Sequence, residues 1–577
     1  MVQLTDVHRA WWKEASVYHI YPASFKDSNG DGVGDIPGIV SKLDYIKKLG
    51  ADVVWVCPCY KSPKVDMGYD ISDYRDIDPQ YGTMEDIEQL LEGLHSRGIK
   101  LIMDMVANHT SDQHEWFRSA KASKESPYRD YYIWKKPKVG KHGEKLPPNN
   151  WQSLFSGSVW EYDETSDEYY FHLFTTSQPD LNWENPKVRR EIYEIMRFWL
   201  TKGVDGFRMD AVNFLSKDPS FRDAPVTEPS SKYQHASSYY CMGPRIHEYM
   251  VEIGEILKEH NAFSVGEMAY LYDPTEIIKV VSSDRNELNM VFQFELIDID
   301  RSFSHRYTPK KWTPREFKDI SNKWQVFMQE NDGWNALFLE NHDWGRSVSR
   351  FVSDKPELRT VGAKMLATFI GFQSGTLFVY QGQELGLANM PKSWPLEKYK
   401  DVETINYYKQ LLDDDAPQSV LDLAMSEIRK KARDHARLPF QWDSSCFAGF
   451  STVRPWMDVN DDYREWNAAA QVNDSLSVFS YWRSILDLRR TYKDVLIYGK
   501  FELVHSSHED VCAYQRSFGS DVALVVTSFN DSSISWIVPQ KFLGPGKFLL
   551  SNYADVSPLV AEIVLRPYEA FMCLLSN

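Results

Sequence analysis

Side chains that could do acid–base chemistry follow several short apolar segments of this chain. In sequence order they are Asp104, His109, Arg208, Asp210, Glu267, His342 and Asp343. Carboxylates that lie close together repel each other, which raises the pKa of at least one of them. Cleavage of a glycosidic bond uses such a pair, one carboxylate that attacks and one carboxylic acid that protonates the leaving oxygen. The residue types therefore favour hydrolysis of a glycoside.

Asp210 and Glu267 have different surroundings in the sequence. Arg208 and Asp210 are two residues apart in the segment GFRMD, so on a strand their side chains face the same way. We expect Arg208 to keep Asp210 ionised, which suits a nucleophile. Glu267 follows Val-Gly and has no adjacent basic residue, which suits a carboxyl group that stays protonated. A single acid at the end of a strand can simply cap the next helix, but capping does not explain the whole set.

The elements that must position these side chains alternate along the chain. Apolar segments at 17–22, 53–58 and 100–106 predict strands, and amphipathic stretches at 35–50 and 83–98 predict helices. Five more strands are predicted at 206–210, 263–267, 290–295, 336–343 and 376–381. The strands are apolar on both faces, as in a parallel sheet covered by helices. Eight such units predict the α/β class and a (β/α)8 TIM barrel, whose active sites lie at the C-terminal ends of the strands.

The alternation breaks in places, and the breaks divide the chain. We expect residues 1–107 to form the first part of the barrel and 108–177, which are rich in Trp, Tyr, Lys and Pro, to form an inserted subdomain. Residues 178–499 then form the second part of the barrel, with insertions over its mouth near 387–470. After residue 500 short alternating segments predict a C-terminal antiparallel β domain over 500–577.

The composition of the chain indicates which kinds of molecule the protein can bind. The net charge of −17 argues against nucleic-acid binding. Aromatic residues make up 14% of the chain, which suits stacking against sugar rings but is also usual for a large core. The first residues show no signal-peptide pattern, and no apolar stretch is long enough for a membrane span. Six scattered cysteines without a secretion signal favour a cytoplasmic location.

Six motifs carry a family resemblance. DMVANH, GFRMDAVNF, VGEM and FLENHD resemble, in order, the four signature regions of glycoside hydrolase family 13, the α-amylase superfamily. The segments QPDLN (178–182) and QGQELG (381–386) resemble its α-glucosidase and oligo-1,6-glucosidase branch. The resemblance covers essentially the whole chain.

The resemblance implies a role for each matching residue. Asp210 would be the nucleophile, Glu267 the acid/base, and Arg208 the residue that orients Asp210. The residues that would hold the glucose at the −1 site are His109, Phe174, Gln178, His342 and Asp343. With this pair of carboxylates the enzyme would retain configuration, and we expect their carboxyl groups ~5–5.5 Å apart.

Other positions would close the pocket at its base. In DMGYD (66–70), the resemblance puts Tyr69 under the glucose and Asp66 at the pocket base. The partner of Asp66 would be an arginine of RDHARLPFQW, and we favour Arg437 over Arg433. Such a pair would block longer chains and give exo action, although an ordinary exposed salt bridge is the alternative.

A separate loop predicts a metal ion. Oxygen-bearing side chains stand at every second position, at Asp27, Asn29 and Asp31, and Gly32 follows them. Val33 would contribute its backbone carbonyl, and Asp35 ends the segment. This is the first half of a calcium-binding loop of EF-hand type. We expect a structural Ca²⁺ here and no organic cofactor; a solvated glycine-rich turn is the alternative.

The expected activity is that of an α-glucosidase acting on maltose and maltooligosaccharides, with sucrose as a further substrate. Ala211, the residue after the nucleophile, would lie near the +1 sugar, and the resemblance links a small residue there with α-1,4 preference. An oligo-1,6-glucosidase is the alternative. A sucrose isomerase is disfavoured because the stretch 295–301 lacks the first arginine of that group's basic motif. A non-catalytic relative among the transporter subunits is disfavoured because the three acids are present.

Overall fold

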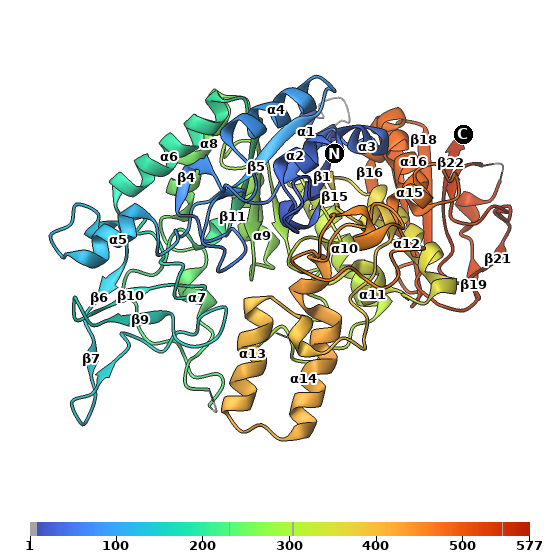
Figure 1. Cartoon of the computed structure of the whole chain (residues 1–577). Coiled ribbons are helices and arrows are strands. Elements are labelled where there is room, and N and C mark those ends of the chain that lie inside the picture. The colour runs from blue at the N-terminus through green and yellow to red at the C-terminus, as the bar shows by residue number, and fades with distance from the viewer. Residues whose placement is uncertain (1–7, 230, 303–304, 545, 577) are drawn as a thin grey trace.

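The computed structural model describes residues 8–229, 231–302, 305–544 and 546–576, and at its centre is a parallel sheet of eight strands. The strands are β1 (Ser16–Ile20), β2 (Val53–Val56), β5 (Lys100–Val106), β11 (Gly206–Asp210), β12 (Phe263–Met268), β13 (Met290–Gln293), β14 (Ala336–Leu337) and β15 (Thr376–Tyr380). They lie in the order β13-β12-β11-β5-β2-β1-β15-β14. A parallel bridge between Val291 and Asn335 joins the two outer strands. The predicted (β/α)8 barrel is confirmed (Figure 1).

Helices follow the strands and cover the outside of the barrel. They are α2 (Ile36–Val40), α3 (Leu43–Leu49), α4 (Met84–His95), α6 (Pro186–Thr201), α8 (Ile246–Glu259), α9 (Pro274–Val281), α10 (Pro314–Glu330), α12 (Pro356–Gly371) and α16 (Val478–Thr491). Thr83 and Asp86 form a reciprocal capping box at α4, as their spacing predicts. The prediction of a single helix over 35–50 is wrong. The chain leaves helical geometry at Lys42 (φ −115°, ψ 9°) and forms the two short helices α2 and α3.

The seventh strand is much shorter than its sequence predicts. Only Ala336 and Leu337 pair with β15, and residues 338–343 continue as a loop. In that loop the buried Glu340 accepts hydrogen bonds from the backbone of Ser347 (2.9 Å) and from Arg346 (3.1 Å). These contacts tie the loop to the start of α11 (Ser347–Phe351). They explain why an apolar run leaves the sheet early.

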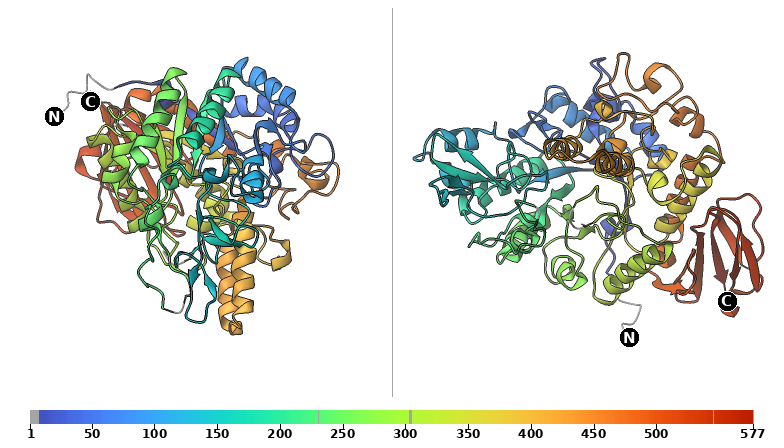
Figure 2. Two further views of the ribbon diagram at one scale, coloured as in Figure 1. Left: turned by 90° about the vertical axis from the view of Figure 1, so that its left-hand side faces the viewer. Right: turned by 90° about the horizontal axis from the view of Figure 1, so that it is seen from below.

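Two insertions stand at one end of the barrel. Within 108–177, β6 (Trp134–Lys135), β9 (Trp160–Asp163) and β10 (Glu168–Phe171) form a three-stranded antiparallel sheet. Within 387–470, α13 (Val402–Asp413) and α14 (Gln418–Lys431) form a helical hairpin. Both project below the barrel in Figure 1, and the hairpin lies end-on near the centre when the molecule is viewed from below (Figure 2). The end of the barrel that carries these insertions is the end where the predicted acids lie.

The C-terminal domain is antiparallel, as predicted. Its main sheet has the order β16-β17-β18-β22-β20. The strands are β16 (Lys500–Val504), β17 (Val511–Phe518), β18 (Asp521–Ser528), β20 (Lys547–Ser551) and β22 (Ala570–Ser576). Leu524, Val526 and Phe571 belong to a buried cluster of this domain's own. Among the described residues no helix has the length and apolarity needed to cross a membrane.

The inside of the barrel is a packed core. Trp55 of β2 lies 5.6 Å from Phe292 and 6.4 Å from Phe378, measured between ring centres. Burial of these large rings is strongly favourable, at about 25 cal/mol for each Å² of apolar surface removed from water. Because apolar side chains fill the interior, the polar side chains collect at the carboxyl ends of the strands.

Candidate active site

A pocket opens at the carboxyl ends of the barrel strands. Its walls contain most of the residues singled out from the sequence. The predicted residues that line it are Asp66, Tyr69, His109, Phe174, Asp210, Ala211, Glu267, His342, Asp343 and Arg433. Three others, Gln178, Arg208 and Arg437, lie behind this lining and contact it. The barrel therefore brings together side chains more than 300 residues apart in sequence.

Arg208 connects the carboxylates on one side of the pocket. Its Nη1 lies 2.7 Å from Asp104 Oδ1 and 2.5 Å from Asp210 Oδ1. Its Nη2 lies 2.6 Å from Glu267 Oε2. Neighbouring positions on three adjacent strands, β5, β11 and β12, supply these groups. One guanidinium thus faces three carboxyl groups, of which those of Asp104 and Asp210 are buried and that of Glu267 is partly buried.

The two candidate catalytic acids have raised but different pKa values. Burial raises the pKa of Glu267 to about 8, against the attraction of Arg208 and with added repulsion from Asp210 and Asp343. Burial also raises the pKa of Asp210 to about 6, although Arg208 and a hydrogen bond with Glu267 lower it. At neutral pH Glu267 is therefore mainly protonated and Asp210 mainly ionised.

One part of the sequence argument for these roles was wrong. Glu267 has no basic neighbour in sequence, yet in space it shares Arg208 with Asp210. The barrel brings Arg208 to Glu267 from the adjacent strand, which sequence spacing does not reveal. Glu267 stays protonated because burial outweighs this arginine.

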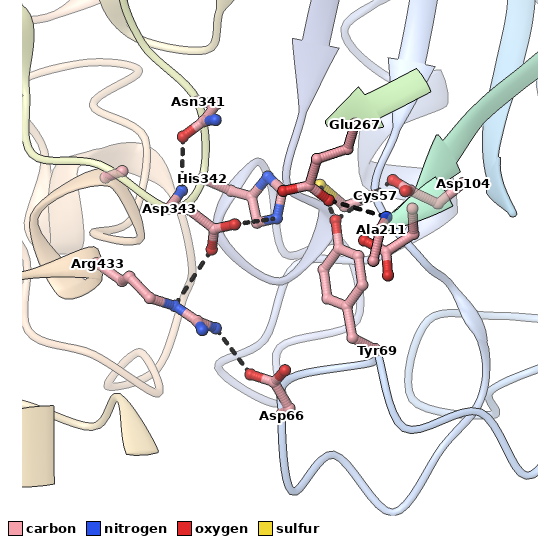
Figure 3. A network of polar contacts seen from close by, with 12 residues as sticks. Cys57, Asp66, Tyr69, Asp104, Ala211, Glu267, Asn341, His342, Asp343 and Arg433 are labelled. Carbon is pink, nitrogen blue, oxygen red and sulfur yellow. Dashed lines mark hydrogen bonds and ion pairs between the residues drawn. The ribbon is translucent and has the colours of Figure 1, made fainter. Parts of the chain in front are cut away.

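Asp343 lies on the opposite side of the pocket among cations (Figure 3). Its Oδ1 is 3.2 Å from Arg433 Nε and 2.9 Å from Arg437 Nη2. Burial alone would raise the pKa of Asp343, but the neighbouring His342 and the two arginines hold it far below its usual range. Asp343 is therefore a permanent anion.

Arg433, and not Arg437, pairs with Asp66 at the pocket base. Arg433 Nη2 lies 2.7 Å from Asp66 Oδ1. Arg437 instead donates to the His342 carbonyl at 3.0 Å and contacts Asp401. The preference for Arg437 was wrong because residues 433–436 form a 3₁₀ turn. With about three residues per turn, positions four apart point in different directions.

Aromatic and imidazole rings form the wall between these two sides. The Tyr69 ring stacks on His342 with a centre distance of 5.1 Å and an interplanar angle of 5°. His109 Nε2 lies 3.0 Å from the Tyr69 carbonyl oxygen and 3.2 Å from Gln178 Nε2. Burial lowers the pKa of His109, and it lowers that of His342 to about 3. Both rings are neutral near pH 7 and can exchange hydrogen bonds with a hydroxylated ligand.

Ala211 lies in the pocket next to the catalytic acids. Its backbone is in the left-handed region (φ 45°, ψ 35°) and its N–H donates to Glu267 Oε2 at 3.2 Å. This conformation follows directly after Asp210 at the end of β11. The side chain at this position therefore borders the space beside both carboxyl groups.

The predicted calcium loop uses its acidic groups to hold its own backbone. Asp27 accepts from the N–H groups of Asn29, Gly30 and Gly32, at 3.1, 2.7 and 3.0 Å. Asp35 accepts from Ser28 N at 2.9 Å and from Gly38 N at the start of α2. Asn29 and Asp31 similarly accept from Asp31 N and Val33 N. The loop presents hard oxygen atoms, the type that Ca²⁺ prefers.

Further lining residues were missed by the sequence analysis. They are Leu154, Phe155, Phe214, Ala269, Tyr270, Phe294, Arg301, Arg306, Trp344 and Glu403. Arg306 Nε lies 3.3 Å from Glu403 Oε1, and both side chains are buried. Glu403 is on α13, where a helical glutamate gives no sequence signal of burial. The location of the 387–470 insertion over the mouth was the only signal that could have pointed to it.

Comparisons with known proteins relate the whole chain to one family. The family model described as alpha amylase, catalytic domain, matches residues 19–499. The chain is 50% identical over 565 residues to an alpha-glucosidase of Schizosaccharomyces pombe, covering 97% of each chain. It is 48% identical to an oligo-1,6-glucosidase of Parageobacillus thermoglucosidasius, covering 98% and 99%. The crystal structure of isomaltulose synthase from Erwinia rhapontici superposes with a TM-score of 0.94 at 40% identity, covering 99% of this chain and all of that one.

Proposed function

This chain belongs to the family of the alpha-amylase catalytic domain and is a glycoside hydrolase, and on that premise we propose that it is a retaining, exo-acting α-glucosidase. The observation that carries the proposal is the pair Asp210 and Glu267. They share the guanidinium of Arg208, and their pKa values differ, at about 6 for Asp210 and about 8 for Glu267. Two carboxyl groups held by one guanidinium favour the short separation of a retaining enzyme over the wider separation of an inverting one.

In the proposed reaction Asp210 attacks the anomeric carbon of the terminal glucose. Glu267 gives its proton to the glycosidic oxygen, the bond to the leaving sugar breaks, and a glucosyl ester forms on Asp210. Glu267, now ionised, removes a proton from water, which attacks the same carbon and releases α-glucose. Arg208 stabilises negative charge on both carboxylates in turn. The permanently ionised Asp343 would bind sugar hydroxyls.

Exo action is supported by the closed base of the pocket. Asp66 and Arg433 form a buried ion pair there, with 6% and 5% of their side chains exposed. The α13–α14 hairpin supplies Glu403 to the same pocket. A pocket closed in this way would accept a chain end and exclude the interior of a long polymer.

The proposal is tested by the first product seen by NMR during hydrolysis of a maltooligosaccharide. We expect α-glucose to appear before mutarotation and starch to be cleaved slowly if at all. β-Glucose as the first product would disprove retention. Internal cleavage of starch would disprove exo action.

We propose that the enzyme prefers α-1,4 linkages and hydrolyses maltose faster than isomaltose, because the small side chain of Ala211 leaves space beside the scissile bond. The alternative is oligo-1,6-glucosidase activity, which the 48% identical relative carries in its name. Sucrose isomerisation is a weaker alternative, because the stretch 295–301 lacks the first arginine of the isomerase motif. Initial rates on maltose, isomaltose and sucrose distinguish the three.

We further propose that Asp27, Asn29, Asp31, Asp35 and the Val33 carbonyl hold a structural Ca²⁺. Metal bound only to the folded state stabilises it, so chelation should lower the melting temperature before it affects turnover. An unchanged melting temperature after chelation would disprove this site. We also propose a cytoplasmic location, which the six unpaired cysteines support.

A further inference from the structure

Three side chains converge at and behind the wall of the pocket, and only His342 among them has a role in binding the sugar. They are His19 of β1, Cys57 just after β2, and His342 in the loop after β14. One nitrogen or sulfur atom of each lies within 4.8 Å of the other two. In the described part of the chain no other group of three or more His, Cys, Asp or Glu side chains converges in this way.

Surrounding contacts fix the cluster. His19 Nε2 lies 3.1 Å from Cys57 Sγ. The His19 ring stacks on Trp55 with a centre distance of 3.4 Å and an interplanar angle of 9°. Nε2 of His342 faces Asp343 Oδ2 at 3.4 Å, whereas its Nδ1 is buried and has no hydrogen-bond partner among the described residues. The structure therefore holds an unused ring nitrogen on a residue of the cluster.

The donor set has a definite chemical preference. Two imidazole nitrogens and one sulfur are the ligands that Zn²⁺ and other thiophilic cations select, while Ca²⁺ and Mg²⁺ prefer oxygen. Burial lowers the pKa of both histidines, so each neutral ring can offer one lone pair to a metal. Burial also raises the pKa of the Cys57 thiol, so the sulfur–metal bond must offset the cost of removing its proton.

The cluster is also connected to the sugar pocket. Tyr69 stacks on His342, and its hydroxyl lies 3.6 Å from Cys57 Sγ. Tyr69 and His342 line the pocket, whereas His19 and Cys57 are not part of its lining. Figure 3 shows Cys57 beside the hydroxyl end of Tyr69. A cation that entered the pocket would meet His342 first and reach Cys57 past the Tyr69 ring.

We propose that His19, Cys57 and His342 form a binding site for a thiophilic divalent cation such as Zn²⁺, and that its occupancy prevents sugar binding. On binding, the Cys57 thiol releases its proton to solvent and forms the sulfur–metal bond, and each histidine donates one ring lone pair. Water takes the remaining tetrahedral position. His342 becomes a metal ligand and is no longer available to a sugar. Only this inhibitory consequence rests on the proposed glucosidase activity.

The test is a titration of the full chain with CoCl₂ in a buffer that keeps Ca²⁺ present, followed by competition with ZnCl₂. We expect one Co²⁺ per chain with a near-ultraviolet thiolate-to-cobalt absorption band, which stoichiometric Zn²⁺ removes. Cys57→Ser should lose the band, and His19→Gln should weaken Co²⁺ binding by at least about tenfold. Cys446→Ser, which changes an exposed cysteine, is the matched control and should keep the band.

A wild type without the band would overturn the proposal, as would a band that persists in Cys57→Ser or disappears in Cys446→Ser. If Cys57→Ser does not fold, His19→Gln decides in its place. Inhibition is measured separately, as the rate of hydrolysis of a chromogenic α-glucoside. For each protein the rate with ZnCl₂ is divided by the rate of the same protein without ZnCl₂. Zinc should inhibit the wild type at least about tenfold more strongly than His19→Gln. If the cobalt band forms but zinc does not inhibit, the metal site is supported and the proposal that its occupancy prevents sugar binding is rejected.

Discussion

The two sides of the pocket contain the same residue types in different proportions. On one side Asp104, Asp210 and Glu267 share the single cation Arg208. On the other side Asp66, Asp343 and Asp401 share two cations, Arg433 and Arg437. Burial acts on both sides, so the difference in protonation comes from the ratio of cations to anions.

That ratio separates the roles of the acids. With one guanidinium for three carboxyls, one proton must remain, and burial with repulsion from Asp210 and Asp343 leaves it on Glu267 despite Arg208. With two guanidiniums, Asp343 stays ionised despite its burial. A proton donor and a fixed anion are therefore made from similar side chains by the number of arginines within reach.

The largest expected effect comes from changing the side that has one arginine. Asp210→Asn should lower turnover by about 10⁴-fold or more, because the nucleophile is lost while the fold remains. Glu267→Gln should lose comparable activity on maltose but recover part of it on an aryl glucoside whose leaving group needs no proton. Steady-state rates on both substrates measure this. Wild-type activity in either variant would reject the assignment of roles.

Stability should show the opposite ranking of the two sides. Asp343→Asn removes a partly buried counter-charge from Arg433 and Arg437, which keep Asp66 and Asp401, so it should lower the free energy of unfolding by about 1–3 kcal/mol. Asp210→Asn removes one of three anions around one cation, so it should leave stability unchanged or raise it. Denaturant unfolding of the two variants is the measurement. Equal losses in both would show that the cation ratio does not control the pocket.

The pH dependence of stability sharpens the same comparison. The pKa of Glu267 is raised from 4.5 to about 8 on folding, so its contribution to stability is present below pH 4.5 and is lost as pH rises toward 8. Gln cannot ionise, so Glu267→Gln should raise the melting temperature more at high pH than at low pH. Glu502→Gln, in β16 of the C-terminal domain, is the matched control. A pH-independent difference for Glu267→Gln would contradict the raised pKa.

The strands and the acids at their ends could be predicted because each signal is local. Apolar runs mark the strands, and Asp210 and Glu267 lie at the ends of β11 and β12. Asp343 follows an apolar run as well, although β14 itself ends at Leu337. Contacts across the barrel could not be predicted in this way. The pairing of Asp66 with Arg433 depends on the 3₁₀ turn at 433–436, and the burial of Glu403 depends on where the α13–α14 hairpin stands. Arg208 reaches Glu267 because β11 and β12 are neighbours, which sequence spacing does not reveal.

The smallest expected effect concerns Ala211, which borders the side with one arginine and leaves its charges unchanged. A β-branched side chain there would narrow the space beside the scissile bond. The α-1,6 link has an extra rotatable bond and can move its second sugar aside, whereas the α-1,4 link is shorter and stiffer. Ala211→Val should therefore shift the ratio of kcat/KM values toward isomaltose by about tenfold. This is the usual effect on substrate discrimination of adding one or two methyl groups to a pocket.

The backbone of Ala211 makes a matched control necessary. Its φ of 45° is unfavourable for any residue with a β-carbon, and more so for valine. Ala211→Val could therefore lose activity on both disaccharides by displacing the N–H that contacts Glu267. Ala211→Gly relieves the strain and adds no side chain, so it should keep the wild-type linkage ratio. A steric effect changes the ratio only in the valine variant, whereas displacement of Glu267 lowers both rates together and leaves the ratio unchanged. Measuring kcat/KM on maltose and isomaltose for all three proteins separates the two, and an unchanged ratio in Ala211→Val would reject the steric account.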